Sequence, residues 1–140
     1  MPIERIVVAS DRSETATRAV AWAAEMAQRY EAELTVVQVF VPGPPPPGAE
    51  TALAVYAEKV AGPGTRARVG AGEDPGDAIV AAAEAAKADI LVVGNIGMSG
   101  RREFLLGNVP NRVSHNARCT VVIVNTAEPE SKSRLPWRRS

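Results

Sequence analysis

The sequence has little of what several protein classes require. Its 140 residues contain one cysteine, one histidine and two each of Trp, Tyr and Phe. A single cysteine excludes an internal disulfide framework and suits a reducing cytosol. One His and one Cys cannot by themselves form a multi-ligand metal site. No apolar run approaches a membrane span, and the N-terminus has no signal-peptide pattern. We therefore expect a cytoplasmic protein without a membrane partner.

An excess of charge of one sign is also missing. Sixteen Lys and Arg residues balance sixteen Asp and Glu residues, so the formal net charge is zero. Nucleic acids and anionic membranes usually select basic proteins. We therefore expect no nucleic-acid partner.

What is present favours one globular domain. Hydrophobic residues make up 46% of the chain, an ordinary globular level, and the length suffices for one core. Residues 127–140 lack periodicity and contain two prolines. We predict a folded domain over residues 1–126 and a disordered tail over residues 127–140.

Apolar runs rich in β-branched residues alternate with helical patterns along the chain. The strands are predicted at residues 3–9, 34–41, 65–69, 90–93 and 120–124, and the helices at 15–30, 50–60, 75–87 and 109–117. Continuous apolar strands that alternate with helices indicate an α/β fold, in which helices cover both faces of a parallel sheet.

The most informative motif follows the apolar run 90–93. Gly94, Gly97 and Gly107 form a G-x2-G-x9-G pattern, and a helical pattern begins at Val109. A strand that leads into a glycine-bearing loop and then into a helix N-terminus presents backbone N–H groups to a phosphate. Arg101, within the same loop, could also reach a phosphate. The motif therefore favours a phosphate-binding site.

Simpler interpretations stay open for several of these residues. The glycines could serve only a tight connection, because turn glycines need no ligand. Asp11, just after the first strand, could cap a helix, hold a turn or contact a ligand. His115 is interpreted as a solvated surface residue, and Cys119 as a packing residue or a partly exposed thiol.

Over residues 1–126 the chain resembles the universal stress proteins. The matching segments are IVVASD at 6–11, ADILVVG at 88–94, the G-x2-G-x9-G loop and RCTVVIV at 118–124. The loop and its continuation LLGNVP at 105–110 are similar to a small bacterial subgroup that is associated with cyclic AMP as well as ATP. The resemblance implies the adenine-nucleotide α/β fold, an open five-stranded parallel sheet of order 3-2-1-4-5, usually in a dimer.

In that strand order the ligand crevice lies between the first and fourth strands. The resemblance places adenine near Ala9, Asp11 and Val39, and ribose near Asp11 and Gly94. The predicted nucleotide-binding residues are Ala9, Ser10, Asp11, Val39, Gly94, Asn95, Gly97, Arg101, Gly107, Asn108 and Val109. The family pattern has Ser or Thr where this chain has Asn108, whose bulkier amide can still donate and cap a helix.

The resemblance predicts a stress-response or signalling module that binds ATP, AMP or cyclic AMP, with or without Mg²⁺, and has no strong catalytic activity. A slow ATPase or autokinase and a nucleotide-free dimeric interaction module are the alternatives. Against catalysis, the sequence offers no general base near the loop and no acidic pair suited to Mg²⁺.

The last strand carries a prediction about assembly. In the order 3-2-1-4-5 the segment from Thr120 to Asn125 is an edge strand, and it is apolar from Val121 to Val124. An exposed apolar edge pairs with another chain unless it is covered. We therefore predict a two-fold homodimer through this strand, as the resemblance also implies.

Overall fold

The computed structural model describes residues 2–95 and 109–126. Within these residues the elements are β1 (Arg5–Ala9), α1 (Glu14–Tyr30), β2 (Glu33–Phe40), α2 (Ala49–Ala61), β3 (Arg66–Ala71), α3 (Pro75–Ala85), β4 (Ile90–Gly94), α5 (Val109–Asn116) and β5 (Thr120–Val124). Each predicted element is confirmed, with bounds that differ by at most two residues. The predicted tail, residues 127–140, lies outside the described residues.

The five strands form one parallel sheet of order β3-β2-β1-β4-β5, which confirms the expected order and the α/β class. In the register, Val8 of β1 lies between Val36 of β2 and Val92 of β4. After β3 the chain returns to the middle of the sheet to form β4 beside β1. The strand order therefore reverses between β1 and β4, where ligands bind in sheets of this kind.

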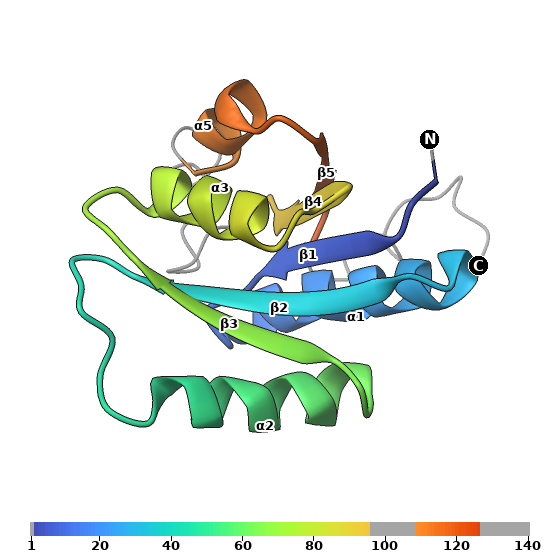
Figure 1. Cartoon of the computed structure of the whole chain (residues 1–140), viewed down its shortest axis with the longest axis horizontal. Helices are drawn as coiled ribbons and strands as arrows, with labels where there is room; N and C mark the ends of the chain where they lie inside the picture. Colours follow the sequence, from blue (N-terminus) through green and yellow to red (C-terminus); the bar gives the residue numbers. More distant parts are fainter. Residues whose placement is uncertain (1, 96–108, 127–140) are drawn as a thin grey trace, which may run out of the picture.

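Helices cover both faces of the sheet, as Figure 1 shows. Alternate residues of β1 point to opposite faces. Ile6 and Val8 pack with α1 and α2 in one hydrophobic cluster. Val7 and Ala9 pack with α3 and α5 in the other. The two cores explain why the central strands are apolar along their whole length.

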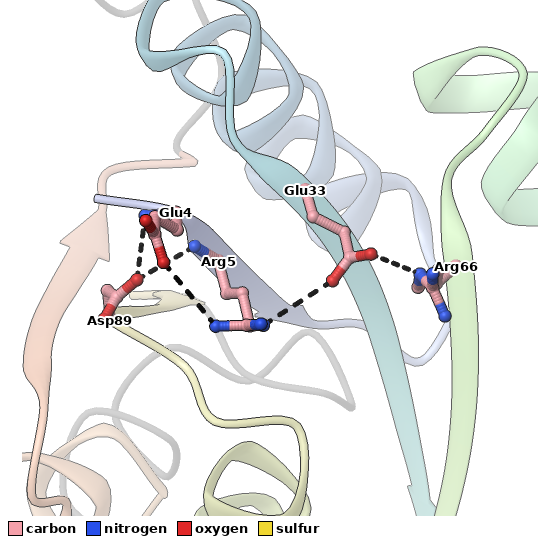
Figure 2. Close-up of polar contacts among 5 residues, drawn as sticks. All are labelled: Glu4, Arg5, Glu33, Arg66 and Asp89. Carbon is pink, nitrogen blue, oxygen red and sulfur yellow. Dashed lines mark hydrogen bonds and ion pairs between the residues drawn. The ribbon is translucent and has the colours of Figure 1, made fainter. Parts of the chain in front are cut away.

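A charged cluster lies at the amino end of the sheet (Figure 2). Asp89 Oδ2 accepts hydrogen bonds from the backbone N–H groups of Glu4 and Arg5, at 2.8 and 2.9 Å. These bonds lower the pKa of the Asp89 carboxyl. The Arg5 guanidinium lies 3.9 Å from the Glu33 carboxylate, which also pairs with Arg66. Charged side chains thus connect the starts of β1, β2 and β3.

The strand β5 lies at one edge of the described sheet and pairs with β4 alone. Its side chains are half-buried or exposed, and Ile123 is 45% exposed. The predicted apolar edge strand is confirmed.

Candidate functional site

The candidate site lies at the carboxyl ends of the neighbouring strands β1 and β4. Ala9 ends β1 and Gly94 ends β4. Ser10 and Asp11 follow the first of these ends, and Asn95 follows the second. The fold therefore places both polar junctions singled out in the sequence at the point where the strand order reverses.

Three of the predicted site residues share the hydrophobic cluster beneath α3 and α5. Ala9 and Val109 are buried in this cluster, and the half-buried Val39 packs against it. Val109 is also the first residue of α5. The face of the sheet beneath α3 and α5 is therefore apolar at these strand ends.

Ser10 faces the opposite side of the sheet and is fully buried. Its hydroxyl oxygen accepts a hydrogen bond from the Arg12 N–H, at 2.9 Å, and lies 2.9 Å from the Tyr56 hydroxyl of α2. These contacts are all within the protein. Ser10 therefore shapes the turn after β1, and a direct contact with a ligand stays a prediction.

Asp11 is half-buried in that turn. Its Oδ1 accepts a hydrogen bond from the Ser13 N–H at 2.9 Å. The Ser13 hydroxyl in turn caps α1 by accepting from the Ala16 N–H at 3.2 Å. Asp11 thus holds the turn, whereas the cap of α1 is Ser13. Among the described residues no donor bonds Asp11 Oδ2, so this oxygen can accept a bond from a ligand.

Asn95 connects the end of β4 to the chain that leaves β5. Its Oδ1 accepts from the N–H of Thr126 at 2.9 Å and from the Thr126 hydroxyl at 3.2 Å. Thr126 is 1% exposed, and its carbonyl accepts from Arg18 of α1 at 2.9 Å. The Asn95 side chain therefore has a structural role here, and its contact with a nucleotide stays a prediction.

The remaining predicted site residues lie outside the described residues. They are Gly97, Arg101, Gly107 and Asn108.

Polar side chains that were not predicted from the sequence hold the two junctions, namely Tyr56, Thr17, Thr126 and Arg18. One signal was available for Tyr56, which lies one helical turn after the buried Leu53 on α2. A tyrosine on the buried side of a helix usually finds a hydrogen-bond partner.

The side chains considered for metal or thiol chemistry do not form a second site. His115 is exposed on α5, as interpreted from the sequence. Burial raises the pKa of the half-buried Cys119 thiol, which disfavours the reactive thiolate. Within residues 2–95 and 109–126 no three His, Cys, Asp or Glu side chains are grouped to hold a metal ion. None of the helices described is long and apolar enough to cross a membrane.

Comparison with known sequences gives one consistent family. Residues 2–125 match the family model described as the universal stress protein family. The chain is similar to the universal stress protein Rv1636 of Mycobacterium tuberculosis, with 34% identity over 86% of this chain and 95% of the relative. A segment covering 40% of the chain is 43% identical to the universal stress protein MJ0531 of Methanocaldococcus jannaschii.

Solved structures share the fold. A universal stress protein in complex with cAMP superposes with a TM-score of 0.71 and 32% identity, over 91% of this chain and 100% of that one. The universal stress protein of Archaeoglobus fulgidus in complex with dAMP gives a TM-score of 0.66 and 25% identity, over 89% and 100% of the two chains.

Proposed function

This chain belongs to the universal stress protein family, and from that premise we propose that it binds an adenine nucleotide at the carboxyl ends of β1 and β4. The structural neighbours that hold cAMP and dAMP support this ligand class. The protein would act as a stress-response module through binding rather than through strong catalysis. A cytoplasmic location stays a prediction.

The observation that carries the proposal is the geometry of Asp11. Its carboxylate is half-buried at the strand-order reversal, and the Ser13 N–H fixes one of its oxygens. The other oxygen can accept from a ribose hydroxyl or an adenine amino group. The half-buried Val39 lies near the carboxyl end of the neighbouring strand β2 and supplies apolar surface at the same edge of the sheet. A base and a sugar would therefore find their two kinds of contact in one place.

Calorimetric titration with ATP, AMP and cyclic AMP tests the proposal directly. We expect binding below millimolar for at least one of them. Asp11→Ala should weaken the affinity for every nucleotide that binds by about tenfold or more, since one charge-assisted hydrogen bond contributes about 1.5–3 kcal/mol. Glu14→Ala is the matched control, because Glu14 is an exposed acid in the first turn of α1. No binding of any nucleotide would refute the proposal.

The glycine pattern supplies the proposed phosphate subsite. Gly97→Val or Gly107→Val should abolish binding with the fold intact, because a β-branched side chain would crowd the phosphates and disfavour positive φ. Circular dichroism checks the fold and calorimetry checks the binding. Unchanged affinity in both variants would assign the glycines to the turn alone.

The nucleotide preference is proposed to depend on Asn108. Asn108→Ser restores the hydroxyl of the family pattern and should strengthen ATP binding relative to cyclic AMP. The measured quantity is the ratio of the two dissociation constants, with and without Mg²⁺. An unchanged ratio would assign the preference to other groups, such as Arg101.

We also propose that the protein is a homodimer through β5. The edge position of this strand and the exposed Ile123 support the assignment. Ile123→Lys should give monomers at micromolar concentration in light scattering, because a desolvated lysine at a paired edge is unfavourable. A monomeric wild-type protein would refute the assignment.

A further inference from the structure

Three hydroxyl groups link the turn after β1 to α2. We call Ser10, Tyr56 and Thr17 the hydroxyl chain. Ser10 Oγ lies 2.9 Å from the Tyr56 hydroxyl, which lies 2.8 Å from Thr17 Oγ1. The Arg12 N–H donates to Ser10 at one end, and Thr17 donates to the Ser13 carbonyl at the other, at 2.9 and 2.8 Å. Both ends of the hydroxyl chain therefore attach to the backbone of the same turn.

The direction of every hydrogen bond in the hydroxyl chain follows from counting protons. A carbonyl can only accept, so the single hydroxyl proton of Thr17 goes to Ser13. Thr17 must then accept the proton of Tyr56, and Tyr56 must accept that of Ser10. Ser10 accepts from the N–H of Arg12. Each proton thus has one position, and aligned bonds of this kind strengthen one another.

The hydroxyl chain also supports an unfavourable backbone conformation. Arg12 has a φ of 70°, in the left-handed region that a residue with a side chain rarely adopts. Its N–H is held by Ser10, which is fully buried. Tyr56 is the middle member and the only one contributed by α2. The conformation of the turn therefore depends on a side chain 46 positions away from Ser10.

We propose that Tyr56 is a positioning residue for ligand binding, which acts through Ser10 to hold the turn that bears Asp11. The inference rests on the proposed function, since it concerns the same site. The Tyr56 hydroxyl contacts Ser10 and Thr17, so it needs no contact with the ligand. Without the Tyr56 hydroxyl, the Ser10 hydroxyl loses the acceptor of its proton and the bond that fixes its orientation toward the Arg12 N–H.

The first experiment compares two tyrosine variants by calorimetry with the nucleotide that the wild-type chain binds best. Tyr56→Phe should weaken binding by about tenfold, equivalent to about 1.4 kcal/mol. Tyr30→Phe, the same chemical change at a half-exposed residue that ends α1, should leave the affinity unchanged. Titrations run well below the melting temperature of each variant, so that loss of binding does not report unfolding.

The second experiment tests whether the hydroxyl itself matters at the other end of the hydroxyl chain. Thr17→Val keeps the shape of the side chain and removes the acceptor of the Tyr56 proton. It should weaken binding as Tyr56→Phe does. Thr17→Ser keeps the hydroxyl and should retain the wild-type affinity.

Hydrogen exchange gives a readout that needs no ligand. In Tyr56→Phe the amide proton of Arg12 should exchange at least several-fold faster than in wild type, whereas amides in the middle of β4 should not change. Unchanged Arg12 exchange, or wild-type affinity in Tyr56→Phe, would overturn the positioning role of Tyr56. Failure of the wild-type chain to bind any nucleotide would instead overturn the proposed function and, with it, this inference.

Discussion

Polar side chains make different kinds of contact at the two ends of the sheet. At the amino end, Arg5, Glu33 and Arg66 begin three adjacent strands and pair mainly with one another (Figure 2). At the carboxyl end, Ser10 and Asn95 accept hydrogen bonds from backbone N–H groups. Ion pairs therefore predominate at the amino end, whereas hydrogen bonds from the backbone to side chains hold the turns at the carboxyl end.

This difference predicts where the protein tolerates substitution. The amino-end side chains of Arg5, Glu33 and Arg66 are 38–68% exposed, and exposed ion pairs contribute about 0–1 kcal/mol each. At the carboxyl end the partners Ser10 and Thr126 are buried. Removal of an acceptor there leaves a buried donor without a bond, which costs about 1–3 kcal/mol. The end with the buried hydrogen bonds is also the end at which we propose ligand binding.

The largest effect on stability is expected from a substitution in α2, the helix that supports the turn at the carboxyl end. Leu53 is fully buried on the helix that supplies Tyr56. Leu53→Ala should lower the free energy of unfolding by about 3 kcal/mol, because it removes apolar contacts and leaves a cavity. Val55→Ala is the control on the same helix, since Val55 is 63% exposed and should change stability by less than about 0.5 kcal/mol. Urea unfolding measures the free energy of unfolding of both variants. Equal losses would contradict the packing of the Leu53 face of α2 against the sheet.

The helices and strands were predictable because the signals that determine them are local. The β-branched runs that became β1 and β4 are buried on both faces, so their apolar pattern is continuous in the sequence. The cap and proline at Asp74 and Pro75 likewise mark the start of α3 within a few residues. The strand order came from the resemblance to a family, since periodicity alone does not order strands.

The turns at the carboxyl end were only partly predictable. Polar residues directly after a strand, such as Asp11, are visible in the sequence. Their partners are not, because Tyr56 meets Ser10 across 46 positions and Thr126 meets Asn95 across 31. Such pairs depend on how α2 packs against the sheet and on how β5 pairs with β4. No local pattern reveals the bond from Thr126 to Asn95, and the contact of Asn95 with a ligand stays a prediction.

The second-largest effect on stability is expected at Asn95, whose side chain holds the carboxyl end of the sheet through Thr126. Asn95→Ala removes the acceptor of the buried Thr126 N–H and hydroxyl and should lower the free energy of unfolding by about 2 kcal/mol. Asn95→Asp keeps an oxygen at that position and should cost less than half as much. Thermal and urea unfolding measure the two variants, and an equal cost would show that the Thr126 bonds add little.

A smaller effect is expected at the amino end, where the side chain of Asp89 accepts hydrogen bonds from the backbone N–H groups of Glu4 and Arg5. At pH 7, Asp89→Asn should lower the free energy of unfolding by about 1 kcal/mol, because the charge-assisted part of these bonds is lost. We expect a loss of this small size because the Asp89 carboxylate lies near solvent, which screens its charge.

The pH dependence of that difference has a definite sign. The pKa of Asp89 is lowered in the folded state by its bonds to Glu4 and Arg5. The ionised carboxylate therefore stabilises the fold above its unfolded pKa of about 3.9, and this stabilisation is lost as the pH falls through the lower folded value. The gap between wild type and Asp89→Asn should close in acid. A gap that is constant from pH 7 to pH 2.5 would contradict this account.

The smallest effect is expected at the far side of the amino end. Arg66 is 68% exposed and pairs with Glu33, so Arg66→Gln should cost no more than about 0.5 kcal/mol, and the cost should disappear in 1 M salt. A larger loss of unfolding free energy that persists in 1 M salt would mean that Arg66 and Arg5 stabilise each other's ion pair through the shared Glu33. A double-mutant cycle of Arg66→Gln with Arg5→Gln separates the cases. An interaction energy near zero would show independent exposed pairs. A value above about 0.5 kcal/mol would show a cooperative network and reduce the difference between the two ends of the sheet.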